Sequence, residues 1–388
     1  MNPNSWSILF FGGNGIYSCM ILAIGIYVGY LFFLLVLIMA WNSWSSLSSQ
    51  NLELPLSVIV PFRNEEKMLP MLIDSLKAQS HTSFEVIFIN DHSEDESLKV
   101  LDQALQDVPF DFQIHSLEAP FGKKEAITIG VALATHDLIL TTDADCFATP
   151  NWLTEMSSPF NEQRLQMLVG PVGLVGESFW QKMQSIEFSS LIGTGGALLR
   201  LKAPVMANGA NLAYRKDVFE AVSAFEGIEE TPWGDDELLM NKVSKKFPGS
   251  IRFQKSSKAL VLTNALKDWA EFRQQRLRWA SKWKVGFRPV TIFSALAVFV
   301  VQLIQVGLIV QAFTSHGNLG LIAALLLLKL LIEYIFLWSV RRSFGQKMDG
   351  LAFLVNYLLY PFYAIYFGIA ANFGKFHWKG RRYKTSTK

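Results

Sequence analysis

Three long stretches of the sequence contain no Lys, Arg, Asp or Glu, and they limit the possible folds more than any other feature. One precedes Glu53, one lies between Arg288 and Lys329, and one lies between Asp349 and Lys375. A helix needs about 20 mostly apolar residues to cross a bilayer. The sequence therefore predicts membrane-spanning helices at 16–41, 290–313 and 319–340, and a helix at 351–373 that is either spanning or re-entrant.

The first predicted span is interpreted as an uncleaved anchor between an N-terminal tail at 1–15 and a Ser-rich linker at 42–53. It lacks a basic leading region, and it is longer than the apolar core of about 7–15 residues in a signal peptide. Cys19 and Cys146 are the two cysteines. Their positions suggest no disulfide framework, which suits a reducing compartment.

The basic residues predict how the chain is oriented in the membrane. Arg341, Arg342 and Lys347 follow the third span, whereas residues 314–318 contain no Lys or Arg. Because cytoplasmic loops carry an excess of Lys and Arg, the soluble domain is expected in the cytoplasm. The sequence thus predicts an integral protein of the inner or plasma membrane.

The segment at 351–373 leaves one question of topology open. The tail at 374–388 is strongly basic, and it would lie outside the cytoplasm if this segment crossed the bilayer. Asn356 and Pro361 interrupt the segment, so a re-entrant or interfacial helix is the alternative. Lys329 and Glu333, four residues apart within a predicted span, are expected to form an ion pair.

Residues 54–265 are interpreted as a soluble α/β domain. Strand and helix patterns alternate in its first half, which predicts a mostly parallel, doubly wound sheet. The expected strands are 56–60, ended by Pro61, then 84–89, 112–117 and 137–142, and the expected helices are 65–80 and 123–134. The second half is less regular, with loops expected at 193–196 and 208–211 and helices at 217–223 and 235–246.

An acidic pair, Asp143 and Asp145, follows the apolar strand pattern at 137–142. Ligands of open α/β sheets bind beyond the carboxyl ends of the strands. Two carboxylates one residue apart at such an end can hold a divalent cation such as Mg²⁺ or Mn²⁺ through hard oxygen ligands. The pair is therefore a candidate metal site, and the metal would bind a diphosphate. A solvated acidic turn is the alternative.

Three further polar clusters lie at the ends of predicted elements, at 61–66, 91–95 and 233–237. Each also has a simpler interpretation, as a turn before a helix, a solvated turn, or an acidic helix cap. The sequence has no Lys/Arg stripe with interleaved aromatic residues, so nothing in it indicates nucleic-acid binding.

Residues 266–287 are predicted to form an amphipathic helix. Trp269, Phe272 and Trp279 fall near helical spacing on one side, and Arg273 and Arg276 belong to the basic remainder. A basic helix with an aromatic face tends to lie in the membrane interface. A helix packed into the protein core is the alternative.

In their order along the chain, these clusters resemble the membrane-bound family 2 glycosyltransferases, whose GT-A fold is an α/β, Rossmann-like nucleotide-sugar-binding domain. The segments that carry the resemblance are Pro61 with Arg63 and Glu65, Asp91, Gly122-Lys123, Asp143-Ala144-Asp145, Asn208 to Asn211, Gly234-Asp235-Asp236, and the Gln-x-x-Arg-Trp motif Gln275, Arg278 and Trp279. The resemblance covers roughly residues 54–283.

The resemblance implies an inverting, metal-dependent transfer of a sugar from a nucleotide-diphosphate sugar, most often a UDP-sugar, to a lipid or glycan acceptor. It implies that Asp236 is the general base, although the family usually has Glu where Asp235 stands, so Asp235 and Glu237 stay open for this role. It also implies that Asp145 binds the metal and that Asp143 binds the metal or the donor. The substrate-binding residues that it implies are Pro61, Arg63, Glu65, Asp91, Lys123, Asp143, Asn211, Asp235, Gln275, Arg278 and Trp279.

Two other functions remain open. A processive polysaccharide synthase also carries Gln-x-x-Arg-Trp. Such an enzyme usually forms a polymer channel, and three or four spans provide few helices to line one. A non-catalytic membrane scaffold could retain a nucleotide-sugar fold, although the intact acidic residues argue against it. A dehydrogenase is not indicated, because Gly-x-Gly-x-x-Gly does not follow the first strand.

Overall fold

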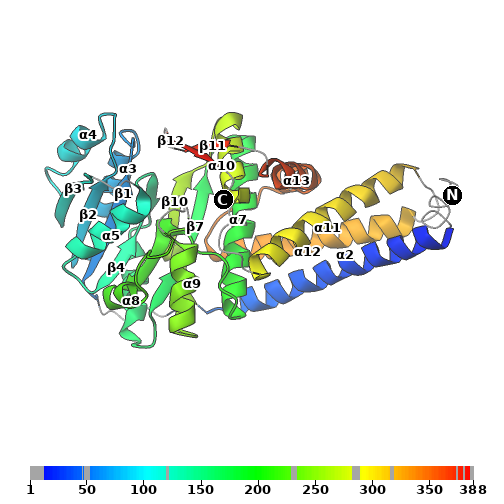
Figure 1. The fold of residues 1–388 in the computed structure, drawn as a ribbon, viewed down its shortest axis with the longest axis horizontal. Helices are drawn as coiled ribbons and strands as arrows, with labels where there is room; N and C mark the ends of the chain where they lie inside the picture. The colour runs from blue at the N-terminus through cyan, green and yellow to red at the C-terminus, as the bar shows by residue number, and fades with distance from the viewer. Residues whose placement is uncertain are drawn as a thin grey trace, which may run out of the picture.

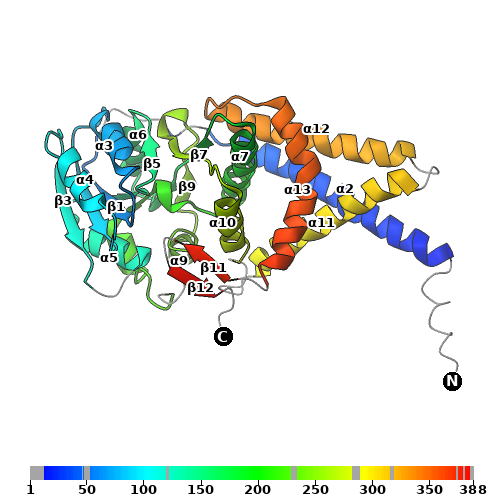
Figure 2. The same ribbon diagram turned by 90° about the horizontal axis from the view of Figure 1, so that it is seen from above.

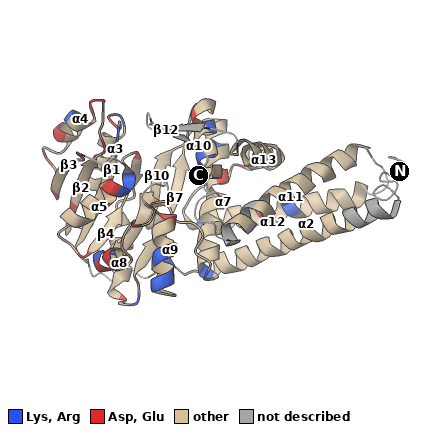
Figure 3. Cartoon of the chain, in the orientation of Figure 1, with Lys and Arg blue, Asp and Glu red and all other residues tan. Residues whose placement is uncertain are grey.

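The computed structural model describes residues 13–45, 47, 53–118, 122–228, 234–281, 289–314, 319–372, 375–378 and 381–384. Figure 1 shows an α/β domain joined end-on to a set of long helices. Lys, Arg, Asp and Glu are spread over the domain and the joint, whereas the long helices carry almost none (Figure 3). This division follows the charge-free stretches of the sequence.

The core of the domain is a seven-stranded sheet with the order β3-β2-β1-β4-β8-β6-β9. Its strands are β1 Leu56–Phe62, β2 Phe84–Asn90, β3 Asp111–Ser116, β4 Leu138–Thr141, β6 Met167–Val169, β8 Leu212–Arg215 and β9 Ile251–Phe253. The first four are parallel neighbours, as predicted, and β8 runs antiparallel to β4 and β6. All residues of β1 and β2 are buried, which is typical of a parallel sheet covered on both faces.

The prediction that Pro61 ends the first strand is wrong. β1 continues to Phe62, and Pro61 pairs with Ile89 of β2. The carbonyl of Ile59 accepts a 3.2 Å hydrogen bond from the N–H of Thr142. The main-chain polar groups of residue 59, and those of residue 61 two positions on, therefore point toward β4. Because β4 ends at Thr141, the missing N–H of Pro61 removes no bond from the ladder.

Helices cover this sheet, and a smaller sheet lies beside it. The helices of the domain are α3 Leu69–Lys77, α4 Ser97–Ala104, α5 Lys123–Leu133, α6 Trp152–Ser157, α8 Lys216–Ala221 and α9 Glu237–Lys246, with short 3₁₀ turns at Ser158–Asn161, Gly209–Asn211 and Ser257–Ala259. The smaller sheet has the order β5-β10-β7, from β5 Cys146–Ala148, β10 Val261–Asn264 and β7 Val172–Val175. The predicted helices are thus present, although the first begins at Leu69 rather than residue 65.

Helix α7, Phe179–Arg200, joins the domain to the long helices, and it contradicts the prediction of a loop at 193–196. A Cβ atom on Gly193 would lie 2.4 Å from a side-chain carbon of Val340. On Gly196 it would lie 2.8 Å from the ring of Trp41. These glycines therefore allow two long helices to approach α7 closely, and they are not turn residues.

The described chain contains four helices that are long and apolar enough to cross a membrane. They are α2 Gly13–Asn42, α11 Pro289–Thr314, α12 Leu319–Ser343 and α13 Gly350–Ala370. Figures 1 and 2 show α2, α11 and α12 running lengthwise as one bundle. Lys329 and Glu333 form the expected ion pair within it, with 2.8 Å between Nζ and Oε1.

Helix α13 lies across this bundle rather than along it. It is seen end-on in Figure 1, where the other three are seen from the side, and from the side in Figure 2. Asn356 donates a hydrogen bond to the carbonyl of Met183 in α7, and Gly368 lies against Phe299 of α11. A hairpin of β11 Lys375–Trp378 and β12 Arg381–Lys384 follows it.

The predicted amphipathic helix corresponds to α10, Trp269–Ser281, and residues 282–287 lie outside the described residues. Part of its aromatic side is turned toward the protein. Phe272 is 3 % exposed and contacts the rings of Trp180 in α7 and Phe367 in α13. Trp269 is 54 % exposed. The packing of Phe272 corresponds to the core-packed alternative.

Candidate functional site

One cavity of about 1080 Å³ connects the carboxyl edge of the large sheet with the interior of the helix bundle. On the domain side it is lined by the loops after β1, β2 and β4, the segment from Val205 to Ala210, the start of α9, and α10. Side chains of α2, α7, α11, α12 and α13 continue the wall away from the sheet. The cavity is therefore shared between the α/β domain and the apolar helices.

Lys123, the first residue of α5, connects two carboxylates on this wall. Its Nζ lies 2.6 Å from Oδ1 of Asp143 and 3.1 Å from Oδ2 of Asp235. Burial alone would lower the pKa of Lys123, but the two carboxylates outweigh burial and raise it. The group stays an ammonium ion and balances part of the negative charge.

Asp236 is fixed by two backbone N–H groups. Its Oδ1 accepts a 2.7 Å hydrogen bond from Glu237 as the cap of α9, and its Oδ2 accepts a 3.2 Å bond from Gly209. Gly209 is held in turn by Thr141 at the end of β4, whose hydroxyl donates to the Gly209 carbonyl at 2.8 Å. Asp236 therefore caps α9, which was the simpler interpretation of the acidic cluster at 233–237. The same hydrogen bonds orient its carboxylate on the cavity wall.

Helix α10 contributes Gln275, Arg278 and Trp279 to the same cavity. Burial lowers the pKa of Arg278, and four nearby carboxylates oppose this effect, namely Asp143, Asp235, Asp236 and Asp145. The Arg278 guanidinium therefore lies near the same acidic cluster that Lys123 contacts.

The position of Trp279 depends on a residue that sequence reasoning did not select. Arg276 lies 4.4 Å from the centre of the Trp279 ring and 4.3 Å from that of Phe272. It forms a buried ion pair with Glu187 of α7, and Glu187 also lines the cavity. The two residues are 89 positions apart, so no local sequence pattern could have indicated the pair.

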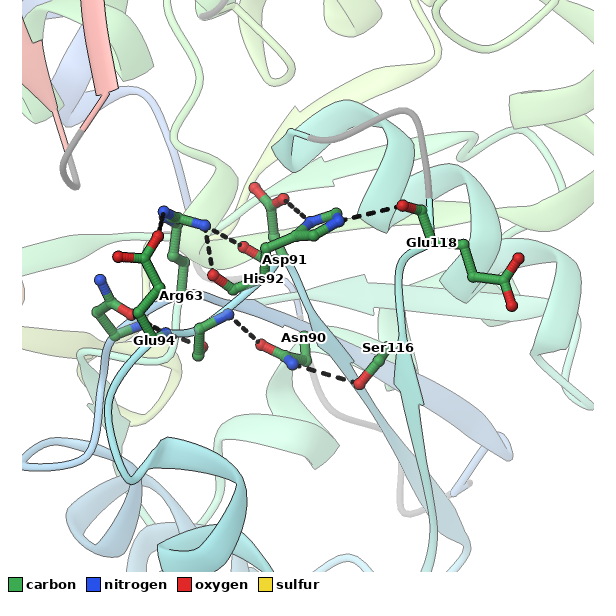
Figure 4. A network of polar contacts seen from close by, with 9 residues as sticks. Arg63, Asn90, Asp91, His92, Glu94, Ser116 and Glu118 are labelled. Atoms are coloured by element: carbon green, nitrogen blue, oxygen red, sulfur yellow. Dashed lines mark hydrogen bonds and ion pairs between the residues drawn. The ribbon is translucent and has the colours of Figure 1, made fainter.

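A polar network shapes the turn after β2 (Figure 4). Arg63 donates to the carbonyl oxygens of Asp91, at 3.0 Å, and of His92, and it pairs with Glu94 at 2.7 Å. Asn90 accepts a 2.9 Å bond from the N–H of Ser93. Arg63 is thus buried beneath the turn and holds Asp91 at the cavity.

Eleven of the residues that the resemblance selected line this one cavity. They are Pro61, Arg63, Asp91, Lys123, Asp143, Asp145, Asp235, Asp236, Gln275, Arg278 and Trp279. Glu65 and Asn211 are not among the described residues that line it.

The side chain of Asn211 has structural partners instead, and the main chain of Glu65 is held by Ser97. Asn211 is fully buried, and its Nδ2 donates to the carbonyls of Pro171 and Ala259, both at 2.8 Å. Its Oδ1 accepts from the indole of Trp152 at 2.9 Å. The Glu65 main chain donates to Ser97 at 2.7 Å. The expectation of an acceptor contact at Asn211 is therefore corrected to a role in joining three segments of the domain.

The chemistry of the acidic pair fits a divalent cation. Asp143 and Asp145 both reach the cavity, and the ammonium of Lys123 already contacts Asp143 as a cation would. Across the described ranges, no group of three His, Cys, Asp or Glu side chains could hold a metal. Mg²⁺ sites commonly use one or two protein carboxylates and share the ion with substrate phosphates.

The sequence of residues 57–223 matches a family model described as Glycosyl transferase family 2. The chain is 29 % identical over 140 residues to YkcC of Bacillus subtilis, an uncharacterized glycosyltransferase, with 35 % of this chain and 43 % of that protein covered. It is 35 % identical over 92 residues to the undecaprenyl-phosphate 4-deoxy-4-formamido-L-arabinose transferase of Photorhabdus laumondii, with 23 % and 28 % covered. The matches thus span less than two thirds of these relatives.

The fold is similar to that of the mannosyltransferase PcManGT from Pyrobaculum calidifontis, solved in complex with GDP-Man and Mn²⁺. The TM-score is 0.56 at 15 % sequence identity, and the match covers 86 % of this chain and 98 % of the other. The predicted α/β GT-A fold is therefore confirmed, and residues 57–223 are similar to glycosyl transferase family 2.

Proposed function

We propose that this protein is a membrane-bound, inverting glycosyltransferase that moves a sugar from a nucleotide-diphosphate sugar to a lipid or lipid-linked acceptor. The observation that carries the proposal is the single cavity that contains Asp143, Asp145, Asp236 and Arg278 and extends between the apolar helices. Such a cavity can receive a water-soluble donor from one side and a membrane-embedded acceptor from the other.

Asp236 is the proposed general base. An acceptor hydroxyl oxygen attacks the anomeric carbon of the donor sugar, the bond from that carbon to the diphosphate oxygen breaks, and the hydroxyl proton passes to Asp236. The N–H groups of Gly209 and Glu237 hold the carboxylate in one orientation. A positioned base of this kind contributes about 10²–10⁴-fold to a rate.

Arg278 and Lys123 are the proposed cationic partners of the departing diphosphate. Their side chains face the acidic cluster from α10 and α5. Asp143 and Asp145 would hold Mg²⁺ or Mn²⁺, which when bound supplies Lewis-acid stabilisation of the leaving group. The complex of PcManGT with GDP-Man and Mn²⁺ supports this choice of ion.

The turn after β2, which contains Asp91, is the proposed nucleoside site, because Arg63 fixes it at the cavity next to Pro61. By its resemblance to family 2 glycosyltransferases, a UDP-sugar is the proposed donor. The relatives named as undecaprenyl-phosphate transferases support a lipid-linked acceptor. Trp279 would stack on the acceptor or its sugar.

In the proposed topology α2, α11 and α12 cross the inner or plasma membrane, and the catalytic domain is cytoplasmic. Helix α13 would lie in the cytoplasmic interface, with its exposed Leu351, Leu358, Phe362 and Ile369 among the lipids. Both ends of α13 and the basic tail then stay on the cytoplasmic side, in agreement with the positive-inside rule.

A screen of labelled nucleotide-sugars against the purified protein in lipid nanodiscs, followed by lipid extraction, tests the proposal. Transfer of label to the lipid fraction is expected, and chelation of divalent metal should abolish it. A product ladder would instead favour a processive polysaccharide synthase. If no donor is turned over, a non-catalytic scaffold is favoured and the proposal is rejected.

A further inference from the structure

One side of α13 presents hydroxyl-bearing aromatic rings to the cavity. Tyr357, Tyr360 and Tyr363, here called the tyrosine stripe, recur at helical spacing and line the cavity together with Asn356. The rings of Tyr360 and Tyr363 are in contact, with 4.8 Å between their centres. The opposite side of the helix carries exposed apolar residues such as Leu358 and Phe362.

Two carboxylates from other helices face the same space. Glu187 of α7 is paired with Arg276, and Glu333 of α12 is paired with Lys329 and accepts a 3.0 Å bond from Tyr30. All five of these side chains line the same cavity as the stripe. Both of these partners of Glu333 contact its Oε1, and a carboxylate has acceptor sites on two oxygens.

One polar atom on this wall is buried without a partner in the described part of the chain. It is Oε1 of Gln302, whose residue is 2 % exposed. Buried polar groups in native proteins are normally hydrogen-bonded, and an exception requires an explanation. A ligand with hydroxyl groups would supply the missing donor.

A hydrocarbon chain fits this wall poorly, because it would remove water from the carboxylates and the Tyr hydroxyls without replacing their hydrogen bonds. A sugar ring has C–H faces that can pack on aromatic rings and hydroxyls that can bond to Glu, Asn and Tyr. The cavity volume of about 1080 Å³ lies at the upper end of the usual 300–1,000 Å³ for ligand sites, so a donor sugar and an acceptor sugar fit together.

We propose that the tyrosine stripe, with Glu187 and Glu333, is a binding site for a sugar unit of the acceptor, so the acceptor is already glycosylated when it arrives. This inference rests on the proposed glycosyltransferase function and adds the class of acceptor. The attacking hydroxyl lies at Asp236, and the neighbouring sugar unit lies on the stripe.

Photo-crosslinking of the full-length protein in nanodiscs tests the site. The probe is dodecyl maltoside with a photoactivatable group beside the sugar, and the matched probe is dodecanol with the same group. The maltoside is expected to label peptides of α13, α7 and α12, with competition by unlabelled dodecyl maltoside. Competition by free maltose alone would identify a free glycan rather than a lipid-linked one as the source.

The variant Tyr360→Phe/Tyr363→Phe keeps both rings and removes only the hydroxyls. It should lower maltoside labelling on the order of tenfold, as expected for the loss of two hydrogen bonds. Tyr366→Phe, on the exposed side of the same helix, is the matched control and should label normally.

Equal labelling by dodecanol, or unchanged labelling of the double variant, would overturn the inference. Donor turnover is measured in parallel with the same preparations. Turnover without sugar-dependent labelling rejects only the acceptor-sugar site, whereas absence of turnover with every donor rejects the proposed function itself.

Discussion

The main-chain N–H of Gly209 donates a 3.2 Å hydrogen bond to Oδ2 of Asp236. The same glycine lies so close to the charged cluster that a Cβ atom on it would stand 2.9 Å from Oδ2 of Asp235 and 3.1 Å from Nζ of Lys123. A side chain at position 209 would therefore disturb both the proposed base Asp236 and the ion pair between Asp235 and Lys123.

Gly209→Ala should displace Asp235 and Lys123 and tilt the carboxylate of Asp236. A shift of about 1 Å in a catalytic group can cost on the order of 100-fold in rate, so transfer should fall strongly while the fold is kept. Gly307→Ala is the control, because no atom lies within 4 Å of the added carbon. Transfer rates and thermal unfolding, measured side by side, check this; normal transfer by the Gly209 variant would contradict it.

Arg276→Met should destabilise the protein by about 3–5 kcal/mol, since Glu187 would be left buried without its cation. Arg252→Met removes an exposed pair with Glu162 and should cost at most about 1 kcal/mol. The double variant Arg276→Met/Glu187→Met should recover part of the loss. Thermal unfolding in detergent compares the three, and equal effects of the two single changes would refute a structural role for the buried pair.

Asp143→Asn and Asp145→Asn should each raise the concentration of Mn²⁺ needed for half-maximal transfer, because each removes a hard anionic oxygen ligand. Titration of Mn²⁺ into metal-stripped protein gives this concentration for each variant. Asp217→Asn, exposed on α8, is the control. Transfer that is unaffected by metal removal would exclude this role for the acidic pair.

The proposed topology predicts that Lys347→Cys and Lys375→Cys react with a membrane-impermeant maleimide from the same face of sealed vesicles, and that Thr314→Cys reacts from the other. Cys19 is replaced by Ser in this background. Cys146 can remain, because burial raises the pKa of its thiol and keeps it unreactive. Labelling of positions 314 and 375 from one face would mean that α13 crosses the bilayer.

Much of the domain could be predicted because its signals are local. Alternating apolar strands and helices indicate β1 to β4, and short polar motifs at their ends mark Asp91 and Asp143 as cavity residues. The charge-free stretches likewise mark the long helices.

The remaining features depend on contacts between distant segments. A glycine-rich segment such as 193–196 is typical of a loop. Gly193 and Gly196 lie within a helix because Val340 and Trp41 approach them too closely for a larger residue. The direction of α13 is set by its packing on α7 and α11, which its apolar composition does not reveal. Asn211 matches a motif, yet its amide is used by three partners within the domain.

The most direct test of the account is the turnover of Asp236→Asn, measured with the active donor and lipid acceptor. Asn can still accept the Glu237 hydrogen bond and cap α9 through its one amide oxygen, so the fold and the donor site should be kept, although the Gly209 N–H loses its acceptor. We expect transfer to fall by at least about 100-fold while the nucleotide-sugar binds with its normal affinity. Near-normal turnover in this variant would contradict the assignment of Asp236 as the base.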